Sequence, residues 1–209
     1  MANYRYLALG DSYTIGESVE ASLSFPAQLV KAIQKKTGIS ASELRIVAKT
    51  GWTTAELQAG IKKAKPKGPF DLVSLLIGVN NQYRHYEREI FSEEFGLLLD
   101  QAIEFAGGDA SRVFVVGIPD YGCTPFGKEM ASEIDSDLRW YNQEKATVCS
   151  ERGIPFVDIY PESKRALAEP ELLASDNLHP SAAMYALWVE KMLPSALVCL
   201  KPEKFHQAD

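Results

Sequence analysis

Short apolar runs alternate with longer segments of helical periodicity along this chain, and this alternation constrains the fold more than any other feature. The runs 70–77 and 112–117 are almost continuously apolar, which is typical of strands buried on both faces. Five strands are predicted, at 4–9, 44–48, 70–77, 112–117 and 154–159. Five helices are predicted between and after them, at 25–36, 53–64, 92–106, 134–152 and 181–193. This order indicates an α/β fold, a three-layer α/β/α sandwich around a five-stranded parallel sheet with right-handed crossovers.

Capping residues indicate where some of these helices begin. Either Thr53 or Thr54 is a candidate N-cap for the helix 53–64, and Ser92 is the candidate for the helix 92–106. Pro180 is expected near the first turn of the last helix, where its fixed φ and missing N–H are tolerated.

The chain has the size and composition of one folded domain. Its 209 residues predict a single domain over 1–209, with a short polar tail from about 201 and no internal repeat or linker. Hydrophobic residues make up 46% and charged residues 24%, which is enough apolar surface to offset chain entropy and argues against disorder. The net charge of −6 does not suit a phosphate backbone, so no nucleic-acid partner is expected.

Cysteine usage and hydropathy argue against several further classes of protein. Cys123, Cys149 and Cys199 are too few for a disulfide framework and match no zinc-binding spacing, so buried thiols and no metal are expected. We expect 70–79 to be the longest apolar-rich stretch, far short of the roughly 20 residues that a membrane span needs, so no integral membrane contact is expected. The N-terminus shows no secretory signal, which favours a cytoplasmic protein, or a secreted one if a leader has been removed. The sequence leaves the oligomeric state open.

Turns with glycine or polar residues follow the predicted strands. They lie at 10–13, 50–52, 78–81 and 118–122, and a fifth polar segment, 176–180, precedes the last helix. Ligand sites in open parallel sheets form outside the carboxyl ends of the strands. We therefore expect all five segments to meet at one edge of the sheet.

A nucleophile and a base stand out among these turns. A serine hydroxyl such as that of Ser12 is a weak nucleophile unless a base takes its proton, and His179 is the best-placed of the three histidines. His85 lies in a charged stretch and His206 in the polar tail. Asp176 precedes His179 by three residues, a spacing that lets its carboxylate accept a hydrogen bond from the imidazole and fix the tautomer.

Acyl transfer also needs donors for the oxyanion that develops on the substrate. Three candidates are the backbone N–H groups of Ser12 and Gly51 and the side-chain amide of Asn80. Each polar residue has an ordinary role when taken alone: Ser12 as a turn residue, Asp176 as a helix cap and Asn80 as a turn former. Their joint occurrence at successive strand ends favours catalysis.

In these motifs the chain resembles the SGNH hydrolases, also called the GDSL esterase/lipase family, over nearly its full length. The nucleophile block is matched by 10–13, the glycine block by Gly51, the asparagine block by Gly78 and Asn80, and the terminal block by Asp176 and His179. The resemblance implies Ser12 as nucleophile, His179 as base and Asp176 as the residue that orients it. It further implies an oxyanion hole from Ser12, Gly51 and Asn80, a flavodoxin-like sheet and no cofactor.

The chain departs from the family pattern at two positions. Tyr13 stands where the name motif of the family has leucine, a change that need not affect the chemistry. Asn81 stands where many members have an aspartate that would support a loop, which leaves the support of that loop open.

Weaker candidates lie beside the predicted site. Asp11, Trp52 and Tyr83 are candidate substrate contacts, with surface or core packing as the alternative for the aromatic residues. Three basic residues of the segment 84–88 would either attract an anionic group of the substrate or form a solvated face. They are Arg84, His85 and Arg88.

The leading hypothesis is a serine esterase that hydrolyses carboxylic esters through an acyl-enzyme on Ser12. The acidic chain and short loops favour a soluble, short-acyl, small-molecule substrate. An acyltransferase of the same family, with an alcohol in place of water, is one alternative. A non-catalytic flavodoxin-like binding module is another, although the chain has no glycine cluster of the kind that cradles phosphates.

Overall fold

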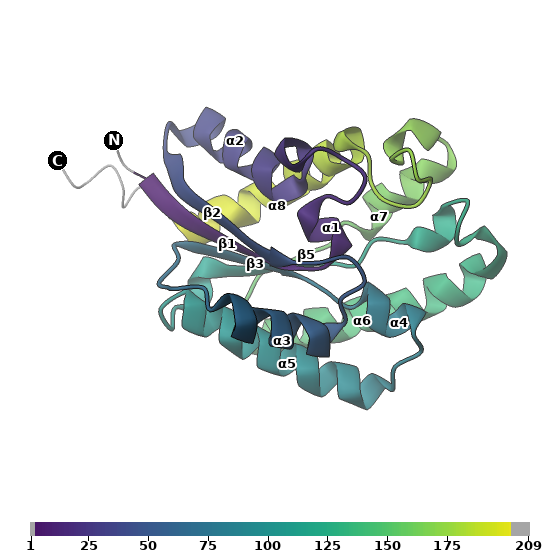
Figure 1. Ribbon diagram of the computed structural model, residues 1–209, viewed down its shortest axis with the longest axis horizontal. Helices are drawn as coiled ribbons and strands as arrows, with labels where there is room; N and C mark the ends of the chain where they lie inside the picture. The colour runs from purple at the N-terminus through teal and green to yellow at the C-terminus, as the bar shows by residue number, and fades with distance from the viewer. Residues whose placement is uncertain (1–2, 202–209) are drawn as a thin grey trace.

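The computed structural model describes residues 3–201 and confirms the predicted fold class. Five parallel strands form one sheet in the order β2-β1-β3-β4-β5 (Figure 1). They are β1 (Asn3–Gly10), β2 (Ser40–Ala48), β3 (Leu72–Leu76), β4 (Val113–Val116) and β5 (Phe156–Val157). The tail predicted from about 201 lies, beyond its first residue, outside the described residues.

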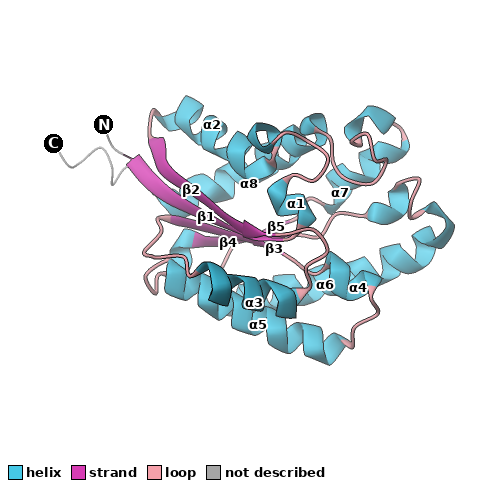
Figure 2. Cartoon of the chain, viewed as in Figure 1, coloured by secondary structure: helices cyan, strands magenta, loops and turns pink. Residues whose placement is uncertain are grey.

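Helices cover both faces of the sheet, which gives three layers (Figure 2). One face carries α1 (Ser12–Ile15), α2 (Phe25–Thr37), α7 (Tyr160–Ser163) and α8 (Ala182–Leu200). The other carries α3 (Thr54–Ala64), α4 (Val79–Tyr83), α5 (Arg88–Phe105) and α6 (Ala131–Glu151). Six single 3-10 turns complete the described elements: Ala21–Leu23, Ala110–Arg112, Tyr121–Cys123, Lys128–Met130, Lys164–Leu167 and Pro170–Leu172.

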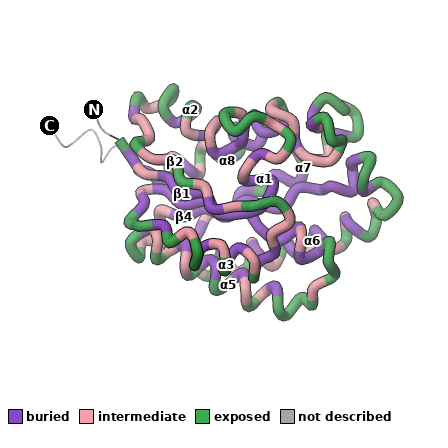
Figure 3. The backbone as a smooth tube through the Cα atoms, viewed as in Figure 1, coloured by how far each residue is buried: buried purple, intermediate pink, exposed green. Residues whose placement is uncertain are grey.

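The core lies between the sheet and each helical layer. Every residue of β3 and β4 is buried, as their continuous apolar sequences predict (Figure 3). On one side the rings of Phe91 and Phe95 stack with centroids 5.7 Å apart, and on the other Trp188 of α8 is fully buried. Burial of each such side chain contributes about 1.5–3 kcal/mol to the free energy of unfolding. This packing holds the carboxyl ends of the strands in fixed positions.

The helix predicted from Ser92 begins four residues earlier. Its first residue is Arg88, and the Ser92 hydroxyl donates to the Arg88 carbonyl at 3.1 Å, so Ser92 lies inside the helix and does not cap it. Phe91 is fully buried, and its packing extends the helix toward the N-terminus. The open choice between Thr53 and Thr54 is settled by the α3 capping box, in which Thr53 is the N-cap.

The last helix is longer than predicted. It runs to Leu200 through Pro194, although proline removes one helical hydrogen bond, because Ala196 and Cys199 beyond it are buried. Ser181 is its N-cap and Pro180 directly precedes it, so Pro180 lies near the first turn as predicted. The expectation that 70–79 is the longest apolar-rich stretch is wrong, because α8 is longer and by length and composition alone would suffice to cross a membrane. Its buried apolar residues pack against α2 and strands β3, β4 and β5, and this packing accounts for part of its composition, while Val198 is exposed.

The fifth strand is shorter than the predicted 154–159. The strand that pairs with β4 is Phe156–Val157. The Pro155 carbonyl still accepts from the Val115 N–H at 2.9 Å, but Pro155 has no N–H to donate. After Val157 the chain turns toward α7, and the Asp158 carboxylate accepts from the Tyr160 N–H at 2.9 Å. The three cysteines are buried and unpaired, as expected.

Candidate active site

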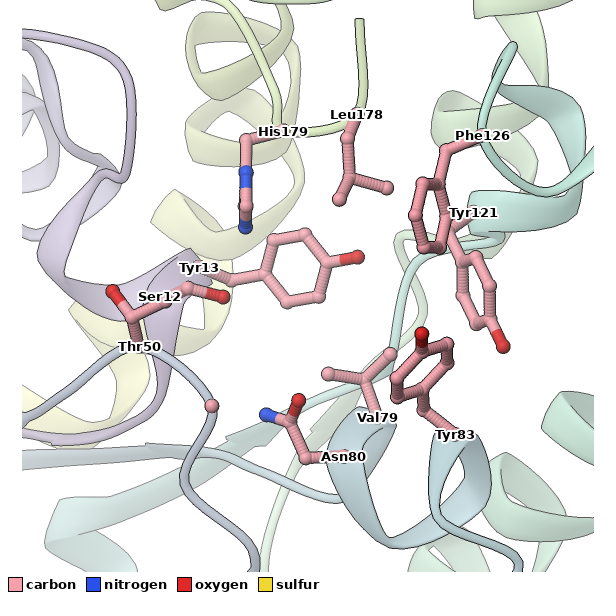
Figure 4. A pocket seen from close by; sticks show the side chains of 11 residues that line it. Ser12, Tyr13, Thr50, Val79, Asn80, Tyr83, Tyr121, Phe126, Leu178 and His179 are labelled. Carbon is pink, nitrogen blue, oxygen red and sulfur yellow. The ribbon is translucent and has the colours of Figure 1, made fainter. Parts of the chain in front are cut away.

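A cavity of about 190 Å³ opens at the carboxyl edge of the sheet. Figure 4 shows side chains from segments far apart in the sequence pointing into it. Its lining residues are Ser12, Tyr13, Thr50, Gly51, Val79, Asn80, Tyr83, Tyr121, Phe126, Leu178 and His179. Each of the five segments expected to meet at this edge contributes at least one of them.

Ser12 opens α1, the single turn that follows β1. Asp11 caps this turn, since its Oδ1 accepts a hydrogen bond from the Tyr13 N–H at 3.0 Å. The first N–H of a helix has no intrahelical acceptor, so the Ser12 N–H remains available for a ligand. Ser12 is 5% exposed and lines the cavity, so the fold places both its hydroxyl and its N–H at this site.

The imidazole of His179 is held by the Asp176 carboxylate. The His179 Nδ1 lies 2.7 Å from Asp176 Oδ2, while Asp176 Oδ1 accepts the backbone N–H groups of Leu178 at 3.0 Å and His179 at 2.9 Å. With Nδ1 engaged, Nε2 is the ring nitrogen left to act on a ligand. Figure 4 shows the imidazole reaching from its loop into the cavity, toward Ser12.

A second hydroxyl contacts the same carboxylate. Ser18 donates from Oγ to Asp176 Oδ2 at 2.6 Å, and Ser18 adopts a left-handed backbone conformation with φ of 64°. Partial burial would raise the pKa of Asp176, but the hydrogen bonds from Ser18, His179 and Leu178 outweigh it and hold that pKa well below its usual range. Asp176 therefore remains ionised beside the imidazole. Ser18 was not among the residues predicted from the sequence.

The loop that carries Gly51 is fixed by hydrogen bonds to its carbonyl oxygens. Arg84 Nη2 donates to the Gly51 carbonyl at 2.6 Å, and Asn80 Nδ2 donates to the Trp52 carbonyl at 2.9 Å. Arg84 also pairs with Glu56 at 3.1 Å. Gly51 has a φ of 81°, a conformation that side chains with a Cβ rarely adopt. These bonds fix the peptide whose N–H is a candidate oxyanion donor.

Asn81 supplies the loop support that the sequence left open. It is fully buried, its Oδ1 accepts from the Thr54 N–H at 3.0 Å, and its Nδ2 donates to Thr54 Oγ1 at 2.6 Å. The Thr54 hydroxyl in turn donates to Glu94. An amide offers both a donor and an acceptor, so Asn81 joins α4 to the start of α3 without a buried charge.

Of the three weaker candidates for substrate contact, one lines the cavity and two do not. Tyr83 lines the cavity, whereas neither Asp11 nor Trp52 is among the lining residues. The Asp11 carboxylate is buried and caps α1, and the Trp52 indole packs against Gly60 of α3, where an added Cβ would come within 2.1 Å of the ring.

The cationic residues beside the site already have anionic partners. Arg84 pairs with Glu56, and Arg88 pairs with Asp137 at 3.3 Å while its guanidinium lies over the Trp140 ring. Their charges therefore stabilise loops and helix contacts in this structure. Within residues 3–201, no group of three or more His, Cys, Asp or Glu side chains is placed to hold a metal ion.

An aromatic wall lines one side of the cavity, and sequence reasoning found only part of it: Tyr83 was a candidate contact and 118–122 a segment expected at this edge, but Phe126 was not identified. Tyr83, Tyr121 and Phe126 contact one another, with ring centroids 6.0 to 6.4 Å apart. Tyr121 is fixed by a hydrogen bond from its hydroxyl to Gln82 Oε1 at 2.7 Å. Leu178 adds an aliphatic side chain, so most of the wall away from Ser12 and His179 is apolar.

Comparison with known proteins identifies the family of this arrangement. The family model described as GDSL-like lipase/acylhydrolase matches residues 8–187. A comparison with curated protein sequences finds no match.

Solved structures share the fold at low sequence identity. TesA matches with a TM-score of 0.73 and 15% identity, over 94% of this chain and 99% of its own. The lipase Lip_vut3 from a goat rumen metagenome matches with a TM-score of 0.70 and 22% identity, over 92% and 97%. A variant of Axe2, an acetyl xylan esterase from Geobacillus stearothermophilus, matches with a TM-score of 0.64 and 20% identity, over 92% and 94%. Two further Axe2 variants, one with a serine and one with an aspartate replaced by alanine, are described as catalytic mutants.

Proposed function

Because the chain belongs to the GDSL-like lipase/acylhydrolase family, we propose that it is a serine esterase that hydrolyses short-acyl carboxylic esters at the cavity beside Ser12. The observation that carries this proposal is the shared placement of Ser12 and His179 on one cavity, with the imidazole held by Asp176 through a 2.7 Å hydrogen bond. A hydroxyl, a base and an oriented carboxylate are the groups that acyl transfer to serine requires.

In the proposed first step His179 Nε2 takes the proton of the Ser12 hydroxyl as Oγ attacks the ester carbonyl. The C–O bond to the alcohol then breaks, the alcohol leaves with the proton from His179, and the acyl group remains on Ser12. In the second step His179 deprotonates a water that attacks this acyl-enzyme, the bond from the acyl carbon to Ser12 Oγ breaks, and Oγ takes the proton back from His179 as the carboxylic acid leaves. Asp176 stabilises the imidazolium that forms in each step, and its lowered pKa keeps it ionised for this role.

The negative charge on the carbonyl oxygen needs donors that are in place before reaction. We assign this role to the N–H groups of Ser12 and Gly51 and to the Asn80 amide, all three on residues that line the cavity. Asn80 Nδ2 has two hydrogens, and the bond to the Trp52 carbonyl uses one of them. The other remains for the oxyanion.

The cavity volume and lining favour a small acyl group. About 190 Å³ is less than the roughly 300–1,000 Å³ of sites that enclose drug-sized ligands. The apolar wall of Leu178, Val79 and the aromatic residues suits an alkyl group, or an alcohol group of the substrate that contains a ring. Among the relatives of known structure, Axe2 is an acetyl esterase, which agrees with this size.

Labelling with a small fluorophosphonate tests the proposal. An activated Ser12 Oγ displaces fluoride and forms an O–P bond, which intact-mass spectrometry detects as one adduct per chain. We expect the wild-type protein and the matched surface variant Ser150→Ala to be labelled and to hydrolyse p-nitrophenyl acetate. Ser12→Ala should lose both properties. Labelling or full turnover in Ser12→Ala would rule out Ser12 as the nucleophile, and an unlabelled wild-type protein would favour a non-catalytic binding module.

A further inference from the structure

A second, smaller space lies behind the proposed active site. It has a volume of about 20 Å³ and shares three lining residues with the larger cavity, namely Tyr13, Tyr121 and Leu178. Residues that line both spaces form the partition between them. Removal of part of this partition would therefore lengthen the larger cavity.

Tyr13 is the part of the partition closest to the proposed chemistry, because it follows Ser12 directly in the sequence. Its ring is 4% exposed and makes edge contacts with His179 and Trp188, at centroid distances of 5.8 and 6.0 Å. Figure 4 shows the ring extending away from Ser12 across the cavity, with its hydroxyl toward Tyr121. An acyl group on Ser12 that grew in this direction would meet the Tyr13 ring.

The space behind Tyr13 is suited to an alkyl chain. Leu173, Met184 and Trp188 present apolar surface to it. Three of its polar side chains have partners within the protein, whereas Trp188 Nε1 is buried without a hydrogen-bond partner among the described residues. Thr124 Oγ1 donates to the Tyr121 carbonyl at 2.7 Å, and Ser163 Oγ donates to the Tyr160 carbonyl at 2.7 Å. Asp120 Oδ1 accepts the Gly122 N–H at 2.8 Å. A methylene chain placed there would leave these hydrogen bonds intact.

We propose that Tyr13 determines the acyl-chain length that the enzyme accepts, by closing the acyl cavity against the apolar space behind it. This inference rests on the proposed acyl-enzyme at Ser12. A shorter side chain at position 13 joins the two spaces and admits medium-length acyl chains. Leucine and methionine are suitable replacements because they keep the site apolar while removing the ring.

The test compares hydrolysis of p-nitrophenyl acetate and p-nitrophenyl octanoate by wild type, Tyr13→Leu and Tyr13→Phe. The readout is the ratio of the two kcat/KM values, because a general loss of activity from a disturbed His179 cancels in a ratio. In a hydrophobic pocket each added methylene that gains a contact is worth about tenfold or more. We expect Tyr13→Leu to raise the octanoate-to-acetate ratio at least tenfold. Tyr13→Phe keeps the ring, removes only the hydroxyl and should retain the wild-type ratio.

A second substitution tests the space itself. Leu173→Phe, added to Tyr13→Leu, places a ring in the opened space and should return the ratio toward the wild-type value. If Tyr13→Leu is too unstable to purify, Tyr13→Met, whose unbranched and flexible side chain adapts to irregular space, replaces it. An unchanged ratio in a variant that a small fluorophosphonate still labels overturns this inference and leaves the esterase proposal standing. Absence of labelling in the wild-type protein overturns the esterase proposal instead.

Discussion

At the scale of single residues, the carboxylate of Asp176 depends on a hydroxyl from a distant loop. Ser18 and His179 both donate to Asp176 Oδ2, at 2.6 and 2.7 Å. A hydrogen bond to a charged group contributes about 1.5–3 kcal/mol. Loss of the Ser18 hydroxyl should therefore loosen the imidazole and lower kcat about tenfold, with little change in KM.

Two substitutions at Ser18 separate this hydrogen bond from backbone strain. Both Ser18→Gly and Ser18→Ala remove the hydroxyl, but only glycine suits the φ of 64° without strain. We expect the two variants to lose kcat equally in p-nitrophenyl acetate hydrolysis. Ser18→Gly should have a higher melting temperature than Ser18→Ala. The matched control Ser22→Ala, in an exposed turn, should leave kcat unchanged. A wild-type kcat in Ser18→Gly would show that the hydroxyl does not position the base.

Asn80 offers a second test at this scale. If its free N–H contacts the oxyanion, Asn80→Ala should lower kcat by about 10²–10³-fold and leave KM nearly unchanged, since the charge develops only in the transition state. Steady-state kinetics with p-nitrophenyl acetate measure both constants. A loss confined to KM would place Asn80 in substrate binding and leave the backbone donors alone at the oxyanion.

At the scale of elements, Arg84 joins α4 to the loop before α3. Its guanidinium contacts the Gly51 carbonyl and the Glu56 carboxylate. The Glu56 carboxylate accepts hydrogen bonds from the Thr53 N–H and from Arg84, and these keep the pKa of Glu56 low despite slight burial. An exposed ion pair contributes at most about 1 kcal/mol to stability. Arg84→Gln should therefore change the midpoint of urea unfolding little, but lower kcat about three- to tenfold through a less fixed Gly51 peptide. Arg152→Gln, which breaks the ion pair with Asp100 between α6 and α5, is the matched control and should leave kcat unchanged. Equal effects of the two substitutions on kcat would contradict the role given to Arg84.

Periodicity in the sequence predicted the five strands and the five long helices, because their buried faces repeat at fixed spacing. The strand-end rule placed Ser12, Asn80 and His179 at one edge, and the structure brings them to one cavity, while their catalytic roles stay predictions. Tyr121 lies in the segment 118–122 that this rule placed at the edge, but the packing of its ring with Phe126 was beyond such reasoning. Both residues lie near short 3-10 turns without periodicity, and Tyr121 is oriented by a hydrogen bond to Gln82, 39 residues earlier. Long-range contacts of this kind leave no local signal.

At the scale of the whole molecule, the sandwich buries a lysine beneath the site. Lys145 of α6 is fully buried, and its Nζ donates to the carbonyls of Ile77 at 3.1 Å and Val116 at 2.8 Å, beyond β3 and at the end of β4. Burial lowers the pKa of Lys145 to about 7, and burial raises the pKa of Asp11 to about 7. Within the described residues, Asp11 Oδ2 has no hydrogen-bond partner. The core thus holds two groups whose charged forms cost free energy in the folded state.

Asp11 and Lys145 should contribute to the free energy of unfolding with opposite dependence on pH. Between about pH 4 and 7 the folded chain keeps a proton on Asp11 that the unfolded chain has lost, so the contribution of Asp11 falls as the pH rises. Between about pH 7 and 10 the unfolded chain keeps a proton on Lys145 that the folded chain has released, so the contribution of Lys145 rises with pH. Between about pH 7 and 10, the lowered pKa of Lys145 should change the free energy of unfolding by on the order of 3 kcal/mol.

Lys145→Met isolates the upper slope. The substitution removes the titrating amine and leaves two carbonyls without this donor, so its absolute stability falls at every pH. The informative quantity is the difference in free energy of unfolding between pH 7 and pH 9.5, measured by urea titration. We expect this difference to be positive in wild type, to remain so in Lys62→Met on the exposed face of α3, and to fall by on the order of 2 kcal/mol in Lys145→Met. If Lys145→Met keeps the wild-type difference, Lys145 is charged throughout this interval, and the two carbonyls that accept from its ammonium hold the charge in the core.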